Sequence, residues 1–362
     1  MTMLCGIEGP GRQGGEAAGW PDPDDPWQVD AGRFPAGGTP REQLRHALRY
    51  AILAPSGHNT QPWRFILRDR SVDLLADRDR ALPVVDPDGR EMVMSCGAAL
   101  GHLRVALDRF GLEHAVVTQP DPHDPDLLAR VHLTGGQMQP DGETLALFEA
   151  IPQRRTTRRP YADRMPAPRD LMACAAAAMA EGACLHLVTA PEERDRVADL
   201  VAAGDRSQMG DPAFRAELAR WMKPRGGRDH DGLSGGSFGM PDILTPVGAM
   251  AVRAIDMGES VAAKDRALAA AGPVLGLLTT ADDTVADWLS AGQALSRVVL
   301  TLTARDMTSA YLNEPVEVEE LRDRLRETLN IGGVPQLLLR IGYGPELAPA
   351  ARRPLTDVLA EA

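Results

Sequence analysis

The strongest constraint on the fold of this chain is an internal repeat of a long helix followed by a short strand. Residues 95–120 align with residues 290–315 at a constant offset, and 127–131 later resembles 337–341. The matched pairs are Ser95 and Ser290, Gly97 and Gly292, Ala99 and Ala294, Leu100 and Leu295, Leu107 and Leu302, Ala115 and Ala310, and Pro120 and Pro315. Matches in a consistent order predict two halves with one ancestral fold. Small residues (Gly97, Ala98, Gly292, Ala294) would let the two long helices approach closely; the alternative is ordinary helix packing in one large domain.

Hydrophobic periodicity predicts a regular alternation of elements from residue 40 onward. The expected helices cover 40–53, 91–111, 141–150, 168–181, 191–209, 212–222, 246–270, 284–306 and 316–329. The expected strands cover 63–68, 71–76, 114–118, 127–133, 273–280, 309–312 and 336–342. Because hairpin-like strand pairs occur among the helices, we expect an α+β fold with mixed sheets flanked by helices. Residues 1–39, rich in Gly, Pro and Asp, are predicted to be a flexible tail or an arm over the body.

The segment Ala-Pro-Ser-Gly-His-Asn-Thr-Gln-Pro-Trp-Arg-Phe at 54–65 joins an apolar helical run to an apolar strand. Ser56, Gly57, His58 and Asn59 form a compact turn whose backbone and short side chains can meet a flat ligand closely. An ordinary turn between a helix and a strand is the alternative interpretation.

Two arginine-rich segments stand out in a chain whose net charge is −12. The first is Arg154-Arg155-Thr156-Thr157-Arg158-Arg159-Pro160-Tyr161, and the second is Arg352-Arg353-Pro354-Leu355. Guanidinium groups match phosphate oxygens in bidentate fashion, and a neighbouring hydroxyl adds a donor. Taken alone, such a segment could also be a solvated surface turn.

Residues 54–65 resemble the APSxxNxQPWxF signature of the nitroreductase superfamily of FMN enzymes, and residues 154–161 resemble its RRSxRxF motif. The resemblance implies that Pro55, Ser56, Gly57 and Asn59 form one wall of an FMN site. It assigns Arg154, Arg155 and Thr156 to the FMN phosphate and ribityl chain, and Arg158 to the N1/C2=O edge of the ring. A positive charge at that edge would stabilise reduced flavin.

The same resemblance extends to two further segments. Arg352 and Arg353 would return to the flavin phosphate. Tyr311, Leu312 and Asn313 align with the strand beside flavin N5, where backbone amides near Leu312 and Asn313 would face the ring. Tyr311 and Asn313 depart here from the usual Pro-x-Glu-Gly type of sequence.

The arrangement of the motifs resembles the Acg-like twin-half nitroreductases, which implies two fused nitroreductase-like halves, 40–138 and 139–362, packed as an intrachain pseudo-dimer. The Pro-Ser turn occurs only in the first half and the arginine motif only in the second, where Glu181-Gly182-Ala183 replaces a second turn. One composite site, and therefore one FMN per chain, is expected. The Gly-rich loop 223–241 sits where the family has a lid; a disordered connection is the alternative.

The implied function is an FMN-dependent oxidoreductase that passes hydride from NAD(P)H through flavin N5 to a nitroaromatic, quinone or enone. The flavin supplies the chemistry, so no catalytic acid or base is required, and Arg158 would tune the ring. The alternatives are an FMN-sequestering protein without turnover and, as a third possibility, a specialised desaturase.

The charge and composition of the chain limit the partners, the location and the metal sites that we expect. The acidic balance argues against a nucleic-acid partner or an anionic membrane surface, which need a basic face. No apolar run approaches 18 residues and no signal-peptide core is visible, so we expect a cytoplasmic protein. Cys96 and Cys174 lie in apolar helical runs and are predicted to be buried thiols. The Gly-rich pattern at 9–14 is rejected as a dinucleotide site, and Asp229-His230-Asp231 is read as solvated, with no metal expected. A small-molecule acceptor is the expected partner, with the pseudo-dimer either monomeric or paired as a homodimer.

Overall fold

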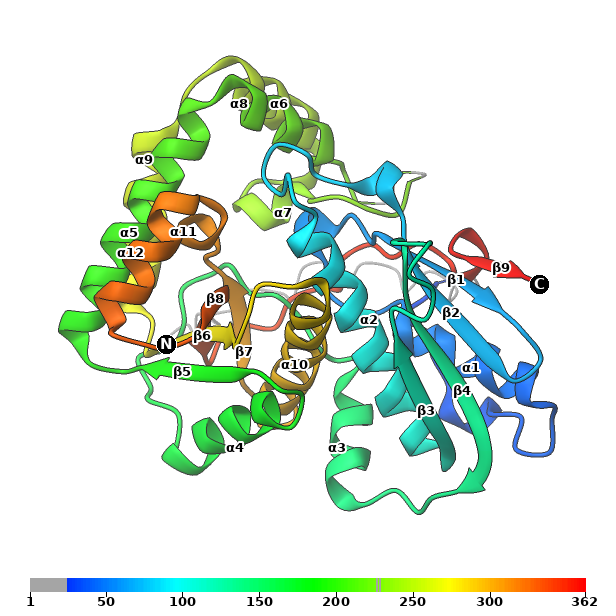
Figure 1. Cartoon of the computed structure of the whole chain (residues 1–362). Coiled ribbons are helices and arrows are strands. Elements are labelled where there is room, and N and C mark those ends of the chain that lie inside the picture. The colour runs from blue at the N-terminus through cyan, green and yellow to red at the C-terminus, as the bar shows by residue number, and fades with distance from the viewer. Residues whose placement is uncertain (1–24, 226, 228) are drawn as a thin grey trace, which may run out of the picture.

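The computed structural model describes residues 25–225, 227 and 229–362; the Gly-rich pattern at 9–14 lies outside them. Two β-sheets flank a central pair of helices (Figure 1). The first sheet has the strand order β3-β4-β2-β1-β9. Its strands are β1 (Trp63–Leu67), β2 (Ser71–Ala76), β3 (Leu112–Thr118), β4 (Leu127–Gln137) and β9 (Leu359–Glu361). The pairs among β1 to β4 are antiparallel, whereas β9 joins β1 in parallel, so this sheet is mixed as predicted.

The second sheet is antiparallel throughout and has the order β5-β6-β8-β7. Its strands are β5 (Cys184–Val188), β6 (Val274–Thr280), β7 (Thr308–Tyr311) and β8 (Val334–Gly342). If β5 to β8 are matched in chain order to β1 to β4, both sheets have the same strand order. Strand β5 was missed by the sequence analysis because five residues at a sheet edge, between two helices, give a weak period-two signal.

The two long helices α2 (Arg90–Arg109) and α10 (Val285–Thr303) pack against each other at the centre of the molecule (Figure 1). A Cβ added at Gly97 would lie 2.4 Å from the carbonyl oxygen of Leu289, and one at Gly292 would lie 2.1 Å from that of Met94. Any side chain at either position would therefore force the helices apart. The prediction that small residues allow this close approach is confirmed.

The second sheet is covered on both faces. On one face α4 (Pro168–Met179) and α10 bury Leu185, Leu278 and Leu337, together with Cys174. On the other face α5 (Pro191–Gly210), α9 (Gly258–Ala271) and α12 (Glu319–Leu329) bury Val188, Leu277 and Leu338. The first sheet packs its inner face on α1 (Pro40–Ala51) and α2, and α3 (Gly142–Ala150) joins the same core. The thiols of Cys96 and Cys174 are buried, as predicted, whereas Cys184 is exposed.

A helical excursion follows β5 and arches above the second sheet (Figure 1). It contains α5, α6 (Pro212–Trp221), α7 (Gly235–Phe238), α8 (Thr245–Ala254) and α9. The single helix predicted over 246–270 is wrong, since α8 ends at Ala254 and α9 begins at Gly258. Asp256 Oδ1 accepts the N–H of Gly258 at 2.8 Å, which replaces a helical bond at the break. The predicted helix over 316–329 is also divided, into α11 (Glu314–Glu317) and α12, at the extended residue Val318.

From residue 25, the described part of the N-terminal segment packs against the C-terminal segment and the end of α2. Trp27 Nε1 donates to the carbonyl oxygen of Ala350 at 2.7 Å, and the ring of Phe34 stacks on that of Phe110 with centroids 4.1 Å apart. None of the described helices combines the length and the apolar character needed to cross a membrane.

Candidate functional site

The turn predicted at 56–59 is tightly constrained. His58, Asn59 and Gln61 adopt left-handed φ angles of 47°, 55° and 53°, a conformation that L residues rarely take. Two hydroxyl groups hold the turn: Ser56 Oγ accepts the N–H of Gln61 at 2.9 Å, and Ser95 Oγ on α2 accepts the N–H of Gly57 at 3.2 Å. The backbone is therefore fixed before any ligand binds.

The arginine segment runs along the edge of the second sheet. The N–H of Thr157 donates to the carbonyl oxygen of Ser309 on β7 at 3.0 Å, and the hydroxyl groups of Thr157 and Thr308 lie 2.9 Å apart. Arg340 on β8, which is 1% exposed, donates to the carbonyl oxygens of Thr157 at 3.2 Å and Arg159 at 3.0 Å. These bonds fix the backbone of the arginine segment against β7 and β8.

The C-terminal arginine Arg352 crosses to the turn of the first half. Its Nη2 donates to the carbonyl oxygens of Ala54 at 2.9 Å and Leu53 at 3.4 Å, and its Nη1 donates to Asn59 Oδ1 at 2.6 Å. Arg154 Nη2 donates to the same carbonyl of Leu53 at 3.4 Å. The structure therefore brings the turn, the arginine segment and the C-terminal segment together at the carbonyl end of α1.

The charges at this junction are not neutralised by the protein. Arg154 is 4% exposed and Arg352 is 3% exposed. Within the described residues, no carboxylate lies within 4.0 Å of the guanidinium groups of Arg154, Arg155, Arg158 or Arg352. Burial is the largest cause that lowers the pKa of all four arginines, and the charge of Arg154 lowers that of Arg352 further. Such a set of cations favours an anionic ligand.

His58 and Tyr311 sit in the same polar surroundings. Burial lowers the pKa of His58 to about 4, with a second contribution from the charge of Arg158. Burial raises the pKa of Tyr311, whereas the charges of Arg154 and Arg158 lower it. His58, Arg158 and Tyr311 each keep some accessible surface although burial dominates their titration.

The predicted residues Arg155 and Thr156 differ in how far the protein already uses their polar groups. Arg155 donates from Nε to the carbonyl oxygen of Leu347 at 3.1 Å and from Nη1 to those of Pro152 and Arg154, and its guanidinium lies 4.9 Å from the centre of the Trp27 ring. The half-buried Thr156 forms only an isolated bridge to Ser309.

The sequence predicts that the backbone amides of Leu312 and Asn313, after β7, face the flavin ring. The structure agrees with this prediction only in part. The N–H of Leu312 donates to the carbonyl oxygen of Leu338 at 2.9 Å, so this predicted donor is committed to the sheet. Of the two predicted amides, only that of Asn313 has no partner among the described residues. The Asn313 side chain donates to Glu91 Oε1 at 3.0 Å and accepts the N–H of Leu338 at 3.0 Å.

The Gly-rich loop lies directly against the turn. Asn59 Nδ2 donates to the carbonyl oxygens of Gly232 and Ala351, both at 3.1 Å, while Gln61 Nε2 donates to that of His230 at 2.9 Å. Asn59 therefore joins the turn, the loop and the C-terminal segment, and its oxygen orients Arg352. Within Asp229-His230-Asp231, the histidine is exposed, as expected, whereas Asp231 is 7% exposed and pairs with Lys223 (2.7 Å) and with Arg80.

Sequence reasoning missed Gln61, although it lies within the first motif. It is fully buried, and its Oε1 accepts the N–H of Arg353 at 2.8 Å. The side chain of Arg353 lies 3.8 Å from Asp77, so this arginine is part of an ion pair, unlike Arg352. A cavity of about 410 Å³ opens beside Arg353 and the loop and is lined by Asp79, Arg80, Arg220, Trp221, Lys223, Asp229, Asp231 and Asp357.

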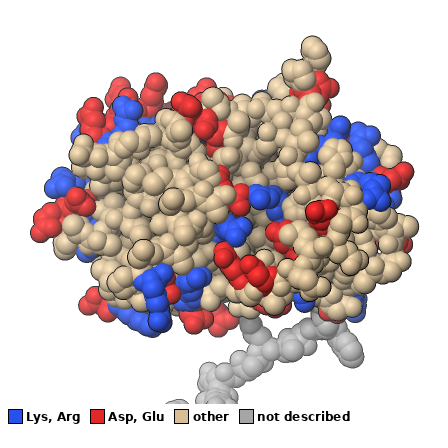
Figure 2. All heavy atoms as spheres, turned by 60° about the horizontal axis from the view of Figure 1, so that its bottom comes forward, with Lys and Arg blue, Asp and Glu red and all other residues tan. Residues whose placement is uncertain are grey.

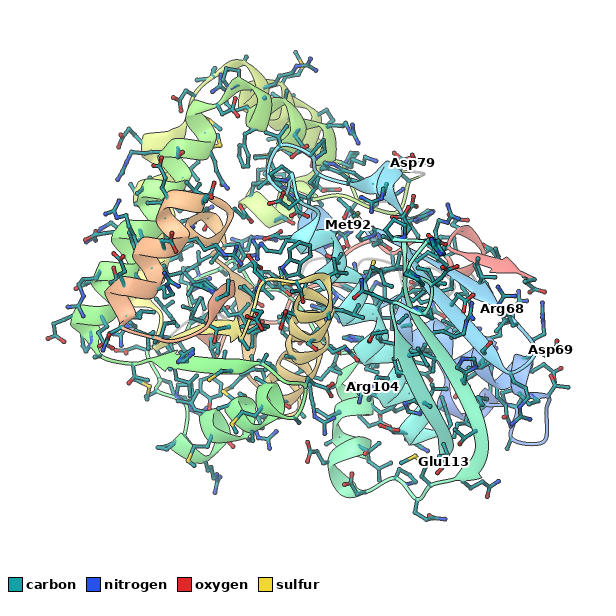
Figure 3. The ribbon with its side chains drawn as sticks, viewed as in Figure 1. Arg68, Asp69, Asp79, Met92, Arg104 and Glu113 are labelled. Atoms are coloured by element: carbon teal, nitrogen blue, oxygen red, sulfur yellow. The ribbon has the colours of Figure 1, made fainter. Side chains whose placement is uncertain are left out.

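The opposite end of the α2–α10 pair is filled. There Glu181, at the position where a second Pro-Ser turn was sought, lies 2.5 Å from Arg104 on α2 and 3.5 Å from Arg297 on α10. Arg104 is labelled in Figure 3 near the start of α3. The cavity that these groups line measures about 10 Å³. Figure 2, turned toward this side, shows basic and acidic side chains meeting in the middle of the molecule.

The relatives found by comparison with known proteins agree on one family. No protein-family model matches the chain. The chain is 36% identical over 323 residues to "Putative NAD(P)H nitroreductase Rv3131" of Mycobacterium tuberculosis, covering 88% of this chain and 91% of that protein. It is 32% identical over 328 residues to "Putative NAD(P)H nitroreductase acg" of the same organism, covering 87% and 94%.

Among solved structures, the FMN- and NADPH-dependent nitroreductase NfnB from Sphigopyxis sp. strain HMH matches with 20% identity and a TM-score of 0.41, over 59% of this chain and 97% of that one. The relatives of known sequence, which match almost end to end, decide the assignment. The chain belongs to the nitroreductase superfamily, within the Acg-like family.

Proposed function

We propose that this protein is an FMN-dependent oxidoreductase of nitroreductase type, with one FMN per chain, that passes hydride from NAD(P)H to an electron-poor small molecule such as a nitroaromatic, quinone or enone. The names of its relatives support the nicotinamide donor and the class of reaction. When bound, the flavin would supply the redox chemistry, and the protein would bind it, orient it and exclude water.

The single observation that carries the proposal is the group of arginines without carboxylate partners between the turn and the second sheet. Arg154 and Arg352 lie deepest and would hold the phosphate, with Arg155 and Thr156 beside them. Arg158 shares its surroundings with His58 and Tyr311 and would lie at the ring, where a fixed positive charge favours the reduced state. Pro55, Ser56 and Gly57 would form the opposite wall. Asn59 would act on the ligand through Arg352, and Leu312, Asn313 and Arg353 would contribute at the margin.

We further propose that the two sheets belong to two halves, 40–138 and 139–362, that pack as a pseudo-dimer. The shared strand order and the symmetrical contact of Gly97 with Gly292 support this interpretation. The filled position around Glu181 supports one site per chain, because the paired charges and the cavity of about 10 Å³ leave no room for a flavin there.

The contacts of the Gly-rich loop favour a second candidate function. The loop 223–241 is bonded to the turn through Asn59 and Gln61, and Asp231 anchors it to Arg80 and Lys223. A loop held closed over a flavin would exclude nicotinamide, which is the property of an FMN-sequestering protein.

The experiment has two parts. Purified protein should bind about one FMN per chain and should prefer FMN to riboflavin, which lacks the phosphate. Arg154→Lys and Arg352→Lys should reduce this preference, whereas Arg64→Ala, at an exposed position on β1, should not. Equal affinity for FMN and riboflavin, or two FMN per chain, would overturn the proposed site. Steady-state oxidation of NADPH with nitrofurazone or menadione then separates the two functions, since sequestration predicts no rate above that of free FMN.

A further inference from the structure

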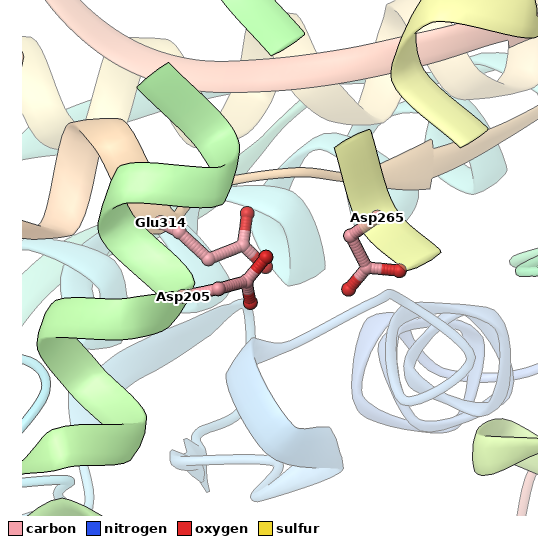
Figure 4. A group of neighbouring side chains, drawn as sticks. All are labelled: Asp205, Asp265 and Glu314. Atoms are coloured by element: carbon pink, nitrogen blue, oxygen red, sulfur yellow. The ribbon is translucent and has the colours of Figure 1, made fainter. Parts of the chain in front are cut away.

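Three carboxylates from three different helices converge outside the arginine cluster. Asp205 on α5, Asp265 on α9 and Glu314 at the start of α11 each offer one oxygen, and these oxygens all lie within 4.8 Å of one another. Figure 4 shows the side chains of Asp205 and Glu314 next to each other, with Asp265 opposite them.

A glycine creates the close approach that brings two of these acids together. A Cβ added at Gly204 would lie 2.7 Å from the Cβ of Glu314 and 2.8 Å from its carbonyl carbon. Only glycine therefore lets α5 lie this near to α11. The next residue, Asp205, then faces Glu314, so the contact between the acids is built into the packing of the helices.

The protein itself does not neutralise these carboxylates. Asp205 is 4% exposed, and its Oδ2 has no hydrogen-bond partner; Oε2 of Glu314 is likewise inaccessible and without a partner. Throughout the described residues, no Lys, Arg or His nitrogen lies within 4.0 Å of the carboxylate oxygens of the three acids. Lys264, Arg158 and Arg340 act on Asp265, and Arg206 and Lys264 act on Asp205, only at longer range. A buried oxygen without a partner costs about 1–3 kcal/mol, and more when it is charged, so its retention points to a missing partner.

We propose that Asp205, Asp265 and Glu314 bind a divalent metal ion of the hard class: magnesium, manganese or calcium. Such ions take oxygen ligands at roughly 2.0–2.6 Å, so oxygens around one ion lie up to about 5 Å apart. Three oxygens that all lie within 4.8 Å of one another are compatible with this geometry. The absence of His and Cys from the cluster disfavours zinc and copper. The ion would tie α5 and α9 to α11, directly after the strand that carries Tyr311. This proposal does not depend on the flavin site.

Binding can be measured on the intact protein after removal of metal with a chelator. Calorimetry with Mn²⁺, Mg²⁺ and Ca²⁺ should show one site per chain, and the thermal midpoint should rise with the concentration of the preferred ion. Asp205→Asn and Asp265→Asn should each abolish the rise or shift it to at least tenfold higher concentration. Asp195→Asn, at an exposed position on the same helix α5, should retain it.

The design separates loss of metal binding from loss of folding. Metal-free Asp205→Asn should be at least as stable as the metal-free parent, because it removes a buried charge. Gly204→Ala should also weaken metal binding, because it displaces α5 from Glu314. No rise in the parent, or an equal rise in Asp205→Asn, would overturn the proposal. FMN stoichiometry measured in the same variants should stay unchanged, so that failure of the flavin site would be recognised separately.

Discussion

The closest helix contact in the molecule gives a quantitative prediction for Gly97→Ala. The new Cβ would lie 2.4 Å from the carbonyl oxygen of Leu289 and 3.0 Å from Cα of Gly292. A carbon normally approaches a carbonyl oxygen no closer than roughly 3.3 Å, so α2 and α10 must separate locally by nearly 1 Å. Both obstructing groups are backbone atoms, which cannot rotate away.

We expect this substitution to destabilise the protein by about 3 kcal/mol, at the upper end of the range for overpacking. For a chain of 362 residues, an unfolding entropy of about 2.1 cal/mol/K per residue makes the thermal midpoint fall by about 4 °C. Gly142→Ala is the matched control, since a Cβ there meets nothing within 4 Å at the start of α3, and it should stabilise by up to about 1 kcal/mol. Thermal unfolding followed by circular dichroism measures both variants.

The double variant Gly97→Ala/Gly292→Ala provides a further check. A Cβ at Gly292 would lie 2.1 Å from the carbonyl oxygen of Met94, on the same helix as Gly97. Since separation of the helices relieves both clashes, the double variant should lose less stability than the sum of the losses in the two single variants. The reasoning is refuted if Gly97→Ala matches the stability of the parent, or if the two losses are fully additive.

Three other predictions concern polar groups at the arginine site and around Glu181. Asn59→Ala removes the side-chain donor to the carbonyl oxygens of Gly232 and Ala351 and one of the two acceptors of Arg352 Nη1, which keeps its bond to the carbonyl oxygen of Ala351. Stability should therefore fall by about 1–3 kcal/mol in urea unfolding, and FMN affinity should fall more than riboflavin affinity. The pKa of His58 is about 4 in the folded protein, below its ordinary value of 6.5. The unfolded chain therefore takes up the proton first, and the stability that neutral His58 contributes is full above pH 6.5 and is lost as the pH falls toward 4. In FMN-free protein, His58→Gln should lose less stability than the parent between pH 6.5 and pH 4. Glu181→Ala leaves Arg104 with Gln293 and Arg297 with the exposed Glu143 as partners, and the loss of the Glu181 ion pairs should cost about 2 kcal/mol in the same assay, while one FMN per chain still binds with unchanged affinity.

Much of the fold could be predicted because its signals are local or repeated. The long helices, the hairpin strands and the glycines at their contact follow from periodicity and from the offset repeat. Strand β9 could not be predicted, because three residues carry no pattern and are ordered only by pairing with Phe65 to Leu67. The break between α8 and α9 was missed since Ile255, Asp256 and Met257 are compatible with a helix, and the Asp256 side chain decides against it.

The sequence predicted which segments form the candidate site, but not which atoms in those segments are bonded to one another. Motif order indicated which segments meet, and the contact of Arg154 and Arg352 with Leu53 is consistent with it. The sequence could not show how hydrogen bonds are distributed among neighbours. Asn59 and Gln61 hold other parts of the protein, and the amide of Leu312 is used by the sheet. These assignments depend on register and on long-range packing, which no local pattern encodes.

The contrast between the two ends of the α2–α10 pair strengthens the case for ligands at one of them. At the Glu181 end, opposite charges pair directly and the space closes to about 10 Å³. At the other end, guanidinium groups remain without carboxylates, and three carboxylates on α5, α9 and α11 remain without cations. Arg158 lies near enough to Asp265 and Glu314 for their charges to counteract the lowering of its pKa, yet no ion pair forms. The same chain therefore pairs its charges around Glu181 and keeps them apart at the arginines and the three carboxylates. Because unpaired buried charges are costly, this separation is best explained by an anionic ligand on one side and a cation on the other.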